Sequence, residues 1–240
     1  RMKEEWFQPI MERFSKRCSD WCERYMSQAA KEVHIKFVAQ ALASYPMGVF
    51  KMTKGFCEKY EKLIRDFWWG DEEGHRQVHW MAWKDMVKPK KGGGIGFKDV
   101  HLFNQALLAR QGWRLIQKPE SLCARVLKSK YYPNGDILDT VFASDASPAW
   151  RAIEFGLELL KEGLIWRVGD GKKIRIERDN LIPRQSGLKP IKFMRRSRLR
   201  WVNQLIHADR NEWKADMVKQ MFHSFDAEEI CRIKLPSRKT

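Results

Sequence analysis

The chain has 240 residues, of which 43% are hydrophobic, and it contains 11 tryptophans and 13 phenylalanines. This aromatic content excludes a disordered tail, because disordered segments lack the apolar side chains that become buried on folding. The 46 lysines and arginines outnumber the 30 acidic residues, and the resulting net charge of +16 favours a polyanionic partner, with nucleic acid as the leading candidate.

The first third of the chain is predicted to be helical. Ser27 is placed to cap a helix that Pro46 would end, and Thr53 or Lys54 opens a second helix that stops at Gly70. Apolar residues at helical spacing are expected to form one face of each helix. They are Val33, Phe37, Val38, Ala41 and Leu42, and then Phe56, Tyr60, Leu63, Ile64 and Phe67.

A tryptophan-rich stretch follows, after an acidic segment at 71–73 that is expected to form an exposed turn. Trp68, Trp69, Trp80 and Trp83 are candidates for stacking on nucleic-acid bases. Tryptophan at apolar spacing more often lies in a core, however, and we expect at least three of these four to be buried. An exposed member would be Trp68 or Trp69, since neighbours on a helix do not both face inward.

The basic segment 88–91 continues into a glycine-rich segment that includes Gly92, Gly93, Gly94 and Gly96. Glycine allows positive φ and close backbone approach, so this segment is predicted to be a flexible loop that could cradle a phosphate. It has the spacing of neither a P-loop nor a dinucleotide-binding fingerprint.

The strongest helix signal runs from Asp99, a candidate N-cap, to Pro119. Leu102, Ala106, Ala109, Trp113 and Ile116 repeat at helical spacing and are expected in the core. On the flank of this helix, Arg110 and Arg114 lie one turn apart and could contact a phosphate backbone together. A shorter helix is predicted to run to Lys130, before the turn at 133–135.

The pattern changes after a helix that Ser147 and Pro148 are predicted to open. Residues 164–168 and 174–176 alternate with a period of two on either side of Gly169-Asp170-Gly171, which predicts a β-hairpin at 164–177. Beyond Pro183 the composition becomes polar and basic, which indicates a linker followed by a last helical pair.

Basic side chains gather in two clusters that are candidate phosphate contacts. The first brackets the glycine-rich loop and continues onto the following helix, and the second lies in residues 172–200, which hold more than half of the net charge. Such contacts hold a backbone without reading bases. A basic run is also typical of a solvated face or a localisation signal. The candidate nucleic-acid-binding residues are Lys88, Lys90, Lys91, Lys98, Arg110, Arg114, Lys172, Lys173, Arg175, Arg195, Arg196, Arg198 and Arg200.

No constellation of residues predicts catalysis or a metal site. His75 and His79 are four apart, with Cys57 upstream, but Gly70 and Gly74 disfavour a helix there and a structural zinc site needs four ligands. The chain has no Asp-Asp dipeptide, a pair of adjacent aspartates that could hold two metal ions. No hydrolase or metalloprotease motif is present either.

The chain is expected to have no membrane partner, because no apolar run approaches the roughly 18 residues of a membrane span. Its five scattered cysteines accompany no signal-peptide pattern, which favours a reducing compartment, and we expect a location in the nucleus or the cytoplasm.

Four sequence blocks follow one another in a characteristic order. The blocks are Phe67-Trp68-Trp69-Gly70, His79-Trp80-Met81-Ala82-Trp83, Pro89-Lys90-Lys91-Gly92-Gly93-Gly94-Ile95-Gly96-Phe97 and Phe103-Asn104-Gln105-Ala106-Leu107-Leu108-Ala109-Arg110-Gln111-Gly112-Trp113-Arg114-Leu115. Together they resemble the part of plant non-LTR (LINE-type) retrotransposon reverse transcriptases that follows the polymerase palm, and the resemblance extends from about Phe7 to Ile230. The chain departs from the family at Glu177 and at Asp179-Asn180-Leu181, where the family has Trp and an Asp-Pro-Trp triplet.

The resemblance and the periodicities together predict a mainly α fold with one short β-hairpin. By resemblance, residues 1–70 form a thumb-like helical segment, residues 71–183 a connector with helices and the hairpin, and residues 184–240 a basic linker with a C-terminal helical segment. The resemblance places the palm and its Mg²⁺ upstream of Arg1 and a ribonuclease H domain downstream of Thr240. We therefore expect no cofactor in this chain.

The expected function is that of a non-catalytic fragment of an RNA-directed DNA polymerase that binds RNA or DNA through phosphate contacts, with an upstream polymerase domain as a possible partner. One alternative is a host-adopted protein-interaction module with a basic nuclear-import segment. Another is a decayed element with no evolved role.

Overall fold

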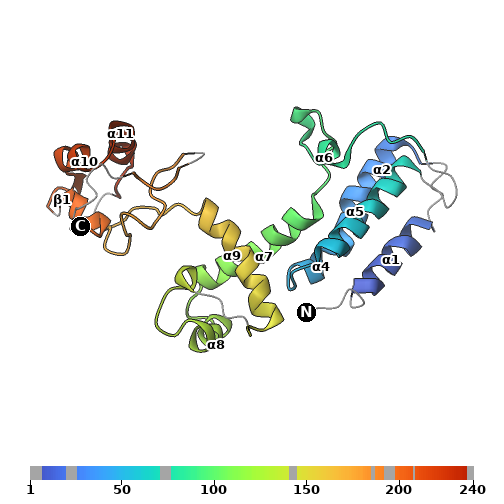
Figure 1. Ribbon diagram of the computed structural model, residues 1–240, viewed down its shortest axis with the longest axis horizontal. Coiled ribbons are helices and arrows are strands. Elements are labelled where there is room, and N and C mark those ends of the chain that lie inside the picture. Colours follow the sequence, from blue (N-terminus) through green and yellow to red (C-terminus); the bar gives the residue numbers. More distant parts are fainter. Residues whose placement is uncertain are drawn as a thin grey trace. The chain divides into compact units, whose positions relative to one another are not determined.

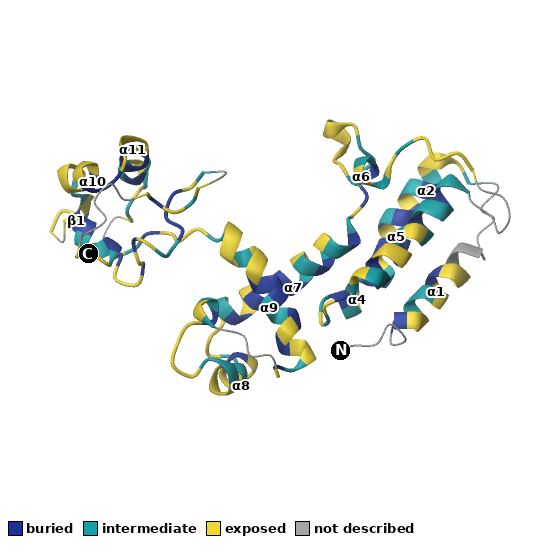
Figure 2. Cartoon of the chain, in the orientation of Figure 1, coloured by how far each residue is buried: buried dark blue, intermediate teal, exposed yellow. Residues whose placement is uncertain are grey.

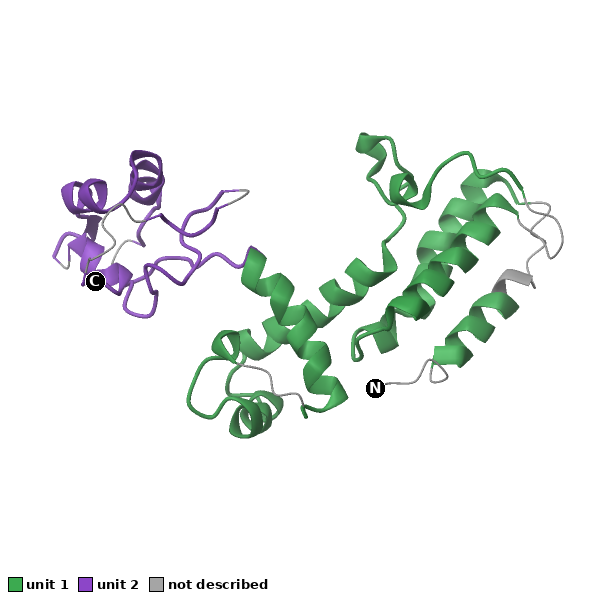
Figure 3. Cartoon of the chain, in the orientation of Figure 1, with its two compact units in different colours: residues 1–162 green, residues 163–240 purple. Residues whose placement is uncertain are grey.

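The computed structural model describes residues 7–19, 26–70, 77–140, 145–184, 187–191, 198–207 and 209–236, and for residues 17–19 only the backbone. The fold is mainly α-helical with one short antiparallel hairpin, which confirms the predicted class (Figure 1). The chain forms two compact units, Arg1–Glu162 and Gly163–Thr240 (Figure 3). The three segments expected by resemblance stay a prediction, because a division into compact units does not show which segment of a related protein each unit corresponds to.

Unit 1 is built from helices joined by short turns. Its elements are α1 (Gln8–Ser19), α2 (Gln28–His34), the π-helical η3 (Ile35–Ala39), α3 (Gln40–Leu42), α4 (Ser44–Met47), α5 (Lys54–Trp69), α6 (Trp83–Met86), η4 (Lys90–Gly92), α7 (Val100–Gln117), α8 (Leu122–Tyr131), η5 (Ile137–Asp139) and α9 (Pro148–Gly163), whose last residue begins unit 2.

The predicted helix boundaries at side-chain caps are confirmed. Ser27, Thr53 and Asp99 each accept a hydrogen bond from the backbone N–H three residues later, which satisfies one of the free donors of a first turn. Gly70 ends α5 in the left-handed conformation, with φ 75°. Pro46 does not end the first helix. It lies within the single turn of α4, where a missing N–H costs little.

The core of unit 1 gathers around α5. Tyr60 is 1% exposed, donates to the Ala39 carbonyl at 2.6 Å, and packs against the rings of Phe14 and Phe56. Figure 2 shows buried and exposed positions alternating around these helices. The helical packing therefore places one aromatic cluster between α1, α5 and the segment that contains α2 and η3.

The apolar face predicted for the first helix is only partly buried. Val33 and Phe37 are 57% and 75% exposed, and Ala41 is exposed as well. The core instead receives Ile35 and Ala39, followed by Ala43 and Met47. These residues also recur at steps of four, so sequence spacing did not distinguish the two faces, and packing against α5 selected the second.

The stripe predicted for α7 is rotated in the same way. Leu102 and Trp113 are 59% and 39% exposed, whereas Asn104 and Leu108 are buried. The cause is the crossing of α7 with α9 (Figure 1). A Cβ atom on Gly156 would lie 2.3 Å from the backbone N of Ala109, so the two helices meet backbone to backbone at these small residues.

The tryptophan prediction was wrong. Trp68 is buried, Trp69 and Trp83 are half-buried, and Trp80 is 84% exposed. Both neighbouring tryptophans pack against another ring. The ring of Trp69 stacks on His79, at 5.5 Å between centroids, and the ring of Trp68 contacts Phe97 edge to face. Trp80 lies in an extended segment before α6, outside any helix that would turn it inward.

Unit 2 combines a short hairpin with two helices. Its elements are η6 (Val202–Leu205), β1 (Ile206–His207), β2 (Glu212–Trp213), α10 (Ala215–Met221) and α11 (Ser224–Arg232). Their buried side chains, which include Val202, Val218 and Ile230, pack with Ile174 and Ile176 into one core.

The hairpin lies elsewhere than predicted. Strands β1 and β2 pair Ile206 with Trp213, whereas residues 164–177 form no strand pair with each other. Segment 174–176 pairs instead with segment 200–202, since Ile176 N donates to Arg200 O and Val202 N to Ile174 O. An alternating sequence predicts an extended segment but does not show which segment it pairs with. Here residues 174–176 pair with residues 200–202 and not with residues 164–168.

No helix in the described ranges has both the length and the apolar character needed to cross a bilayer.

Candidate nucleic-acid interface

The second predicted cluster of cations is assembled by backbone pairing. Segments 174–176 and 200–202 run antiparallel, with hydrogen bonds of 3.0 and 2.9 Å and with Arg175 directly opposite Trp201. Burial alternates along the first segment: Ile174 and Ile176 enter the core, and Arg175 stays exposed. The core of unit 2 therefore directs this arginine to solvent.

The turn before this segment carries two more cations. Gly171 accepts a hydrogen bond from Asn203 N at 3.0 Å, and a Cβ atom on Gly171 would lie 2.6 Å from that nitrogen. Only a glycine permits this close approach. The positive φ of 70° at this position also favours glycine. Lys172 and Lys173 follow in the turn and are both exposed.

Arg175 and Trp201 interact across the pair of segments. The guanidinium of Arg175 lies 5.3 Å from the ring centroid of Trp201, within the range of a cation–π contact. On the same segment, Gln204 Oε1 accepts hydrogen bonds from the backbone N–H groups of Arg200 and Trp201. Arg198 and Arg200 are exposed. Arg195 and Arg196 lie outside the described residues.

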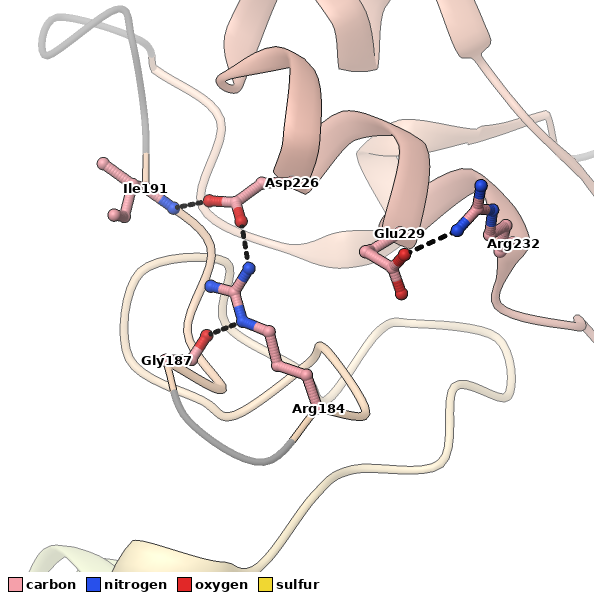
Figure 4. Close-up of polar contacts among 6 residues, drawn as sticks. All are labelled: Arg184, Gly187, Ile191, Asp226, Glu229 and Arg232. Carbon is pink, nitrogen blue, oxygen red and sulfur yellow. Dashed lines mark hydrogen bonds and ion pairs between the residues drawn. The ribbon is translucent and has the colours of Figure 1, made fainter.

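A buried ion pair fixes the loop that precedes these arginines. Asp226 of α11 accepts a hydrogen bond from Arg184 Nη1 and another from Ile191 N, each at 2.7 Å (Figure 4). Arg184 Nε also donates to Gly187 O at 2.6 Å. One carboxylate therefore ties residues 184 and 191 to the core of unit 2. Sequence reasoning missed this pair, since its members are far apart in the chain.

The glycine-rich loop of the first cluster does not cradle a phosphate with its backbone. The N–H groups of Gly92 and Gly94 donate to Pro89 O, that of Gly93 to Lys90 O, and those of residues 95–97 to Met86 O. Every amide from 92 to 97 thus donates to a carbonyl of the loop or of Met86 at the end of α6. The prediction that this backbone could cradle a phosphate was wrong because these amides already have acceptors within the chain.

Two of the loop lysines are paired with carboxylates. Lys90 Nζ lies 2.6 Å from Glu32 Oε1, and Lys88 Nζ lies 2.7 Å from Asp85 Oδ1. Hydrogen bonds from Lys36 and Lys90 hold the pKa of Glu32 below its usual value, and Lys88 does the same to the pKa of Asp85. Lys91 is exposed.

The remaining candidates of the first cluster lie on or near α7. Lys98 Nζ lies 4.0 Å from the ring centroid of Phe103. Arg110 and Arg114 are exposed, and Arg114 Nη1 donates to Gln111 Oε1 at 3.4 Å. The two arginines therefore stand on the solvent side of α7, as predicted.

Asn104, inside the fourth sequence block, has a structural role that periodicity did not reveal. It is fully buried, accepts a hydrogen bond from Met52 N at 2.9 Å, and donates to Met47 O and Phe50 O at 2.7 and 2.9 Å. The sequence did contain one signal of this role, which is a polar residue in the middle of an otherwise apolar helix face. Asn104 fixes the connection between α4 and α5 against α7.

Within the ranges that the structure describes, no three His, Cys, Asp or Glu side chains are close enough to hold a metal ion. His75 lies outside those ranges. Burial raises the pKa of the Cys57 thiol to about 12, so this cysteine remains a thiol at neutral pH.

The fold and the charge distribution define a mainly helical, basic protein, and comparison with known proteins gives its family. The chain is 38% identical over 152 residues to the uncharacterized mitochondrial protein AtMg00310 of Arabidopsis thaliana, a match that covers 63% of this chain and 99% of that protein. The chain therefore belongs to the same family as this Arabidopsis protein. No protein-family model and no solved structure matches the chain.

A longer relative shares most of the chain. The "Putative ribonuclease H protein At1g65750" of Arabidopsis thaliana is 32% identical over 186 residues, which cover 76% of this chain. The match spans only 30% of that protein. Both matches are longer than unit 2, so both include part of unit 1.

Proposed function

We propose that this chain is a non-catalytic, nucleic-acid-binding segment of a protein derived from a plant retroelement. A relative named for ribonuclease H supports a role connected with nucleic acid, since the match lies within a longer protein of that name. The four ordered blocks support the finer assignment to the region after the palm of a LINE-type reverse transcriptase. In this proposal Mg²⁺ belongs to the parent polymerase palm, and the chain acts in the nucleus or the cytoplasm.

The observation that carries the proposal is the pairing of segments 174–176 and 200–202 in unit 2. It brings exposed cations from two separate stretches of sequence onto neighbouring segments, and one of them, Arg175, lies against the ring of Trp201. Lysine and arginine neutralise phosphates and release condensed counterions, which gives affinity without base readout. We call this set the unit-2 cationic surface. It consists of Lys172, Lys173, Arg175, Arg198 and Arg200.

Salt dependence of binding tests this function. If all five cations contact phosphates of a DNA duplex, the logarithm of the association constant should fall with the logarithm of salt concentration with a slope of about −4.5. A fluorescently labelled 20-base-pair duplex, titrated by anisotropy at several KCl concentrations, measures this slope. Binding that is unchanged between low and high salt would contradict the mechanism.

A matched pair of variants separates this surface from the total charge. Lys172→Glu with Lys173→Glu should weaken duplex binding at least tenfold and make the slope shallower by about 2, since two phosphate contacts are lost. Lys219→Glu with Lys234→Glu makes the same change of charge at exposed lysines elsewhere in unit 2. Equal losses in the two double variants would show that only the overall charge matters.

A further inference from the structure

One side of the segment from α2 to α4 carries an apolar line that faces solvent. Its members recur at steps of four, and all are exposed. Val33, Phe37 and Tyr45 are 57%, 75% and 85% exposed. We call this set the outer line, and it consists of Ala29, Val33, Phe37, Ala41 and Tyr45. Isolated exposed apolar residues are ordinary, but a contiguous set marks an interaction surface.

The π-helical turn keeps this line on one side. In a straight α-helix, twelve residues at about 100° each would turn Ala41 by about 120° relative to Ala29. A π-turn acts as one inserted residue, and η3 (Ile35–Ala39) therefore reduces this difference to about 20°. Tyr45 follows in α4, after the turn at Ala43. The irregular turn in the middle of the segment thus aligns the exposed apolar residues.

The opposite side of the same segment is unusually polar for a buried surface. Lys31 and Gln40 are 7% and 4% exposed, and they flank the core residues Ile35 and Ala39 in the sequence. In a helix at a protein surface, polar residues normally lie on the solvent side and apolar residues on the buried side. Apolar residues on both sides are typical of a helix that is covered on both sides.

A pocket lies at the Tyr45 end of the outer line. Its volume is about 320 Å³, within the range of ligand-binding pockets. Apolar residues of α1 and α4 line it, among them Ile10 and Pro46, and Arg13 contributes one cation. No carboxylate in the described part of the chain forms an ion pair with the exposed Arg13.

Positive charge accompanies the outer line at two places. Arg13 lies at its Tyr45 end, and beside Val33 and Phe37 the carboxylate of Glu32 is shared by Lys36 and Lys90, at 2.7 and 2.6 Å, which leaves one positive charge unbalanced. The whole chain carries +16. These charges favour an acidic occupant and disfavour a second copy of the chain, which would bring the same charge to the interface.

We propose that the outer line and this pocket bind an acidic amphipathic helix of a partner protein. The outer line is about 24 Å long at 1.5 Å per residue, which matches a helix of about 16 residues. Apolar side chains of the partner lie along the line, one large side chain fills the pocket, and a carboxylate pairs with Arg13. Helices that dock in this way use apolar anchors at positions i, i+3, i+4 and i+7.

A synthetic peptide tests the proposal. The probe is a fluorescein-labelled 18-residue peptide with Leu and Phe at i, i+3, i+4, i+7 and i+11 and mainly Glu and Ala elsewhere, titrated with the full chain at physiological salt. We expect a Kd of about 10 μM, and binding at least tenfold weaker for a peptide of the same composition in scrambled order. Equal binding of the two peptides would show attraction of charge alone and overturn the proposal.

Variants locate the site on the protein. Phe37→Glu and Tyr45→Glu should each weaken peptide binding about tenfold, and Arg13→Glu about fivefold, because they remove an apolar anchor or the paired cation. Lys62→Glu, at an exposed position of α5, makes the same charge change as Arg13→Glu and should alter binding less than twofold. Unchanged binding in Phe37→Glu and Tyr45→Glu overturns the proposal.

Two further measurements keep the outcomes distinct. Sedimentation of the free chain should show a monomer, and a dimer that Phe37→Glu dissociates would identify a second copy as the occupant instead. Binding of the DNA duplex by Phe37→Glu should equal that of the parent chain, because Phe37 belongs to unit 1 and the proposed phosphate contacts are made by residues of unit 2. Failure of the peptide proposal is therefore distinguishable from failure of the nucleic-acid proposal.

Discussion

Replacement of Asp226 by alanine should selectively loosen unit 2. The carboxylate side chain is 4% exposed, and it accepts one hydrogen bond from the Arg184 guanidinium and one from Ile191 N (Figure 4). Removing one partner of a buried ion pair costs about 3–5 kcal/mol, because the other charge stays buried without compensation. Arg184 is 20% exposed and keeps its bond to Gly187 O, so the cost should lie at the lower end, about 3 kcal/mol.

Hydrogen exchange measures this loss within the full chain. A cost of about 3 kcal/mol corresponds to roughly a hundredfold faster exchange of the protected amides, at about 1.4 kcal/mol per factor of ten. The amides of Val218 and Phe222 are suitable probes, since they donate to Lys214 O and Val218 O and keep these acceptors in the variant. Amides of α5 in unit 1 should exchange as before.

Glu229→Ala on the same helix is the matched control. Glu229 pairs with Arg232 at 2.7 Å, and the side chains are 24% and 70% exposed, so the arginine of this pair is largely in water. An exposed pair contributes about 0–1 kcal/mol, so exchange should rise by only a few-fold. Equal acceleration in the two variants would refute the reasoning that burial, rather than pairing itself, sets the cost.

Three other predictions concern unit 1. Gly156→Ala should destabilise it by about 2 kcal/mol or more, because the new Cβ atom would lie 2.3 Å from Ala109 N, whereas Gly163→Ala, with open space around it, should leave the melting temperature nearly unchanged. Asn104→Ala should cost about 3 kcal/mol in urea unfolding, since it leaves Met52 N and two carbonyls without their partner, and a loss below 1 kcal/mol would contradict this role. Burial raises the pKa of Glu61, so as the pH falls the folded state takes up a proton before the unfolded state does, and this residue's contribution to stability should increase as the pH falls through the raised folded-state pKa toward the ordinary pKa of a glutamate. Glu61→Gln should abolish that part of the pH dependence in unfolding curves, and an unchanged curve would refute it.

The candidate site shows where sequence reasoning succeeds and where it fails. The concentration of cations in residues 172–200 was visible in the sequence, but the pairing that places Arg175 opposite Trp201 was not. The failure at the glycine-rich loop has a similar cause. Glycines indicated a loop correctly, yet only the structure shows that its amides donate to the carbonyls of Met86, Pro89 and Lys90 and leave no cradle for a phosphate.

The sequence by itself determined the local features of this protein. The caps at Ser27, Thr53 and Asp99 and the stop at Gly70 depend on atoms within a few residues, so local chemistry is sufficient to predict them. The helical class follows from the same signals. Only the tertiary structure decided which face of each helix is buried and which segment pairs with 174–176. Several apolar faces and several alternating segments compete in this chain, and the choice among them depends on contacts between residues distant in sequence.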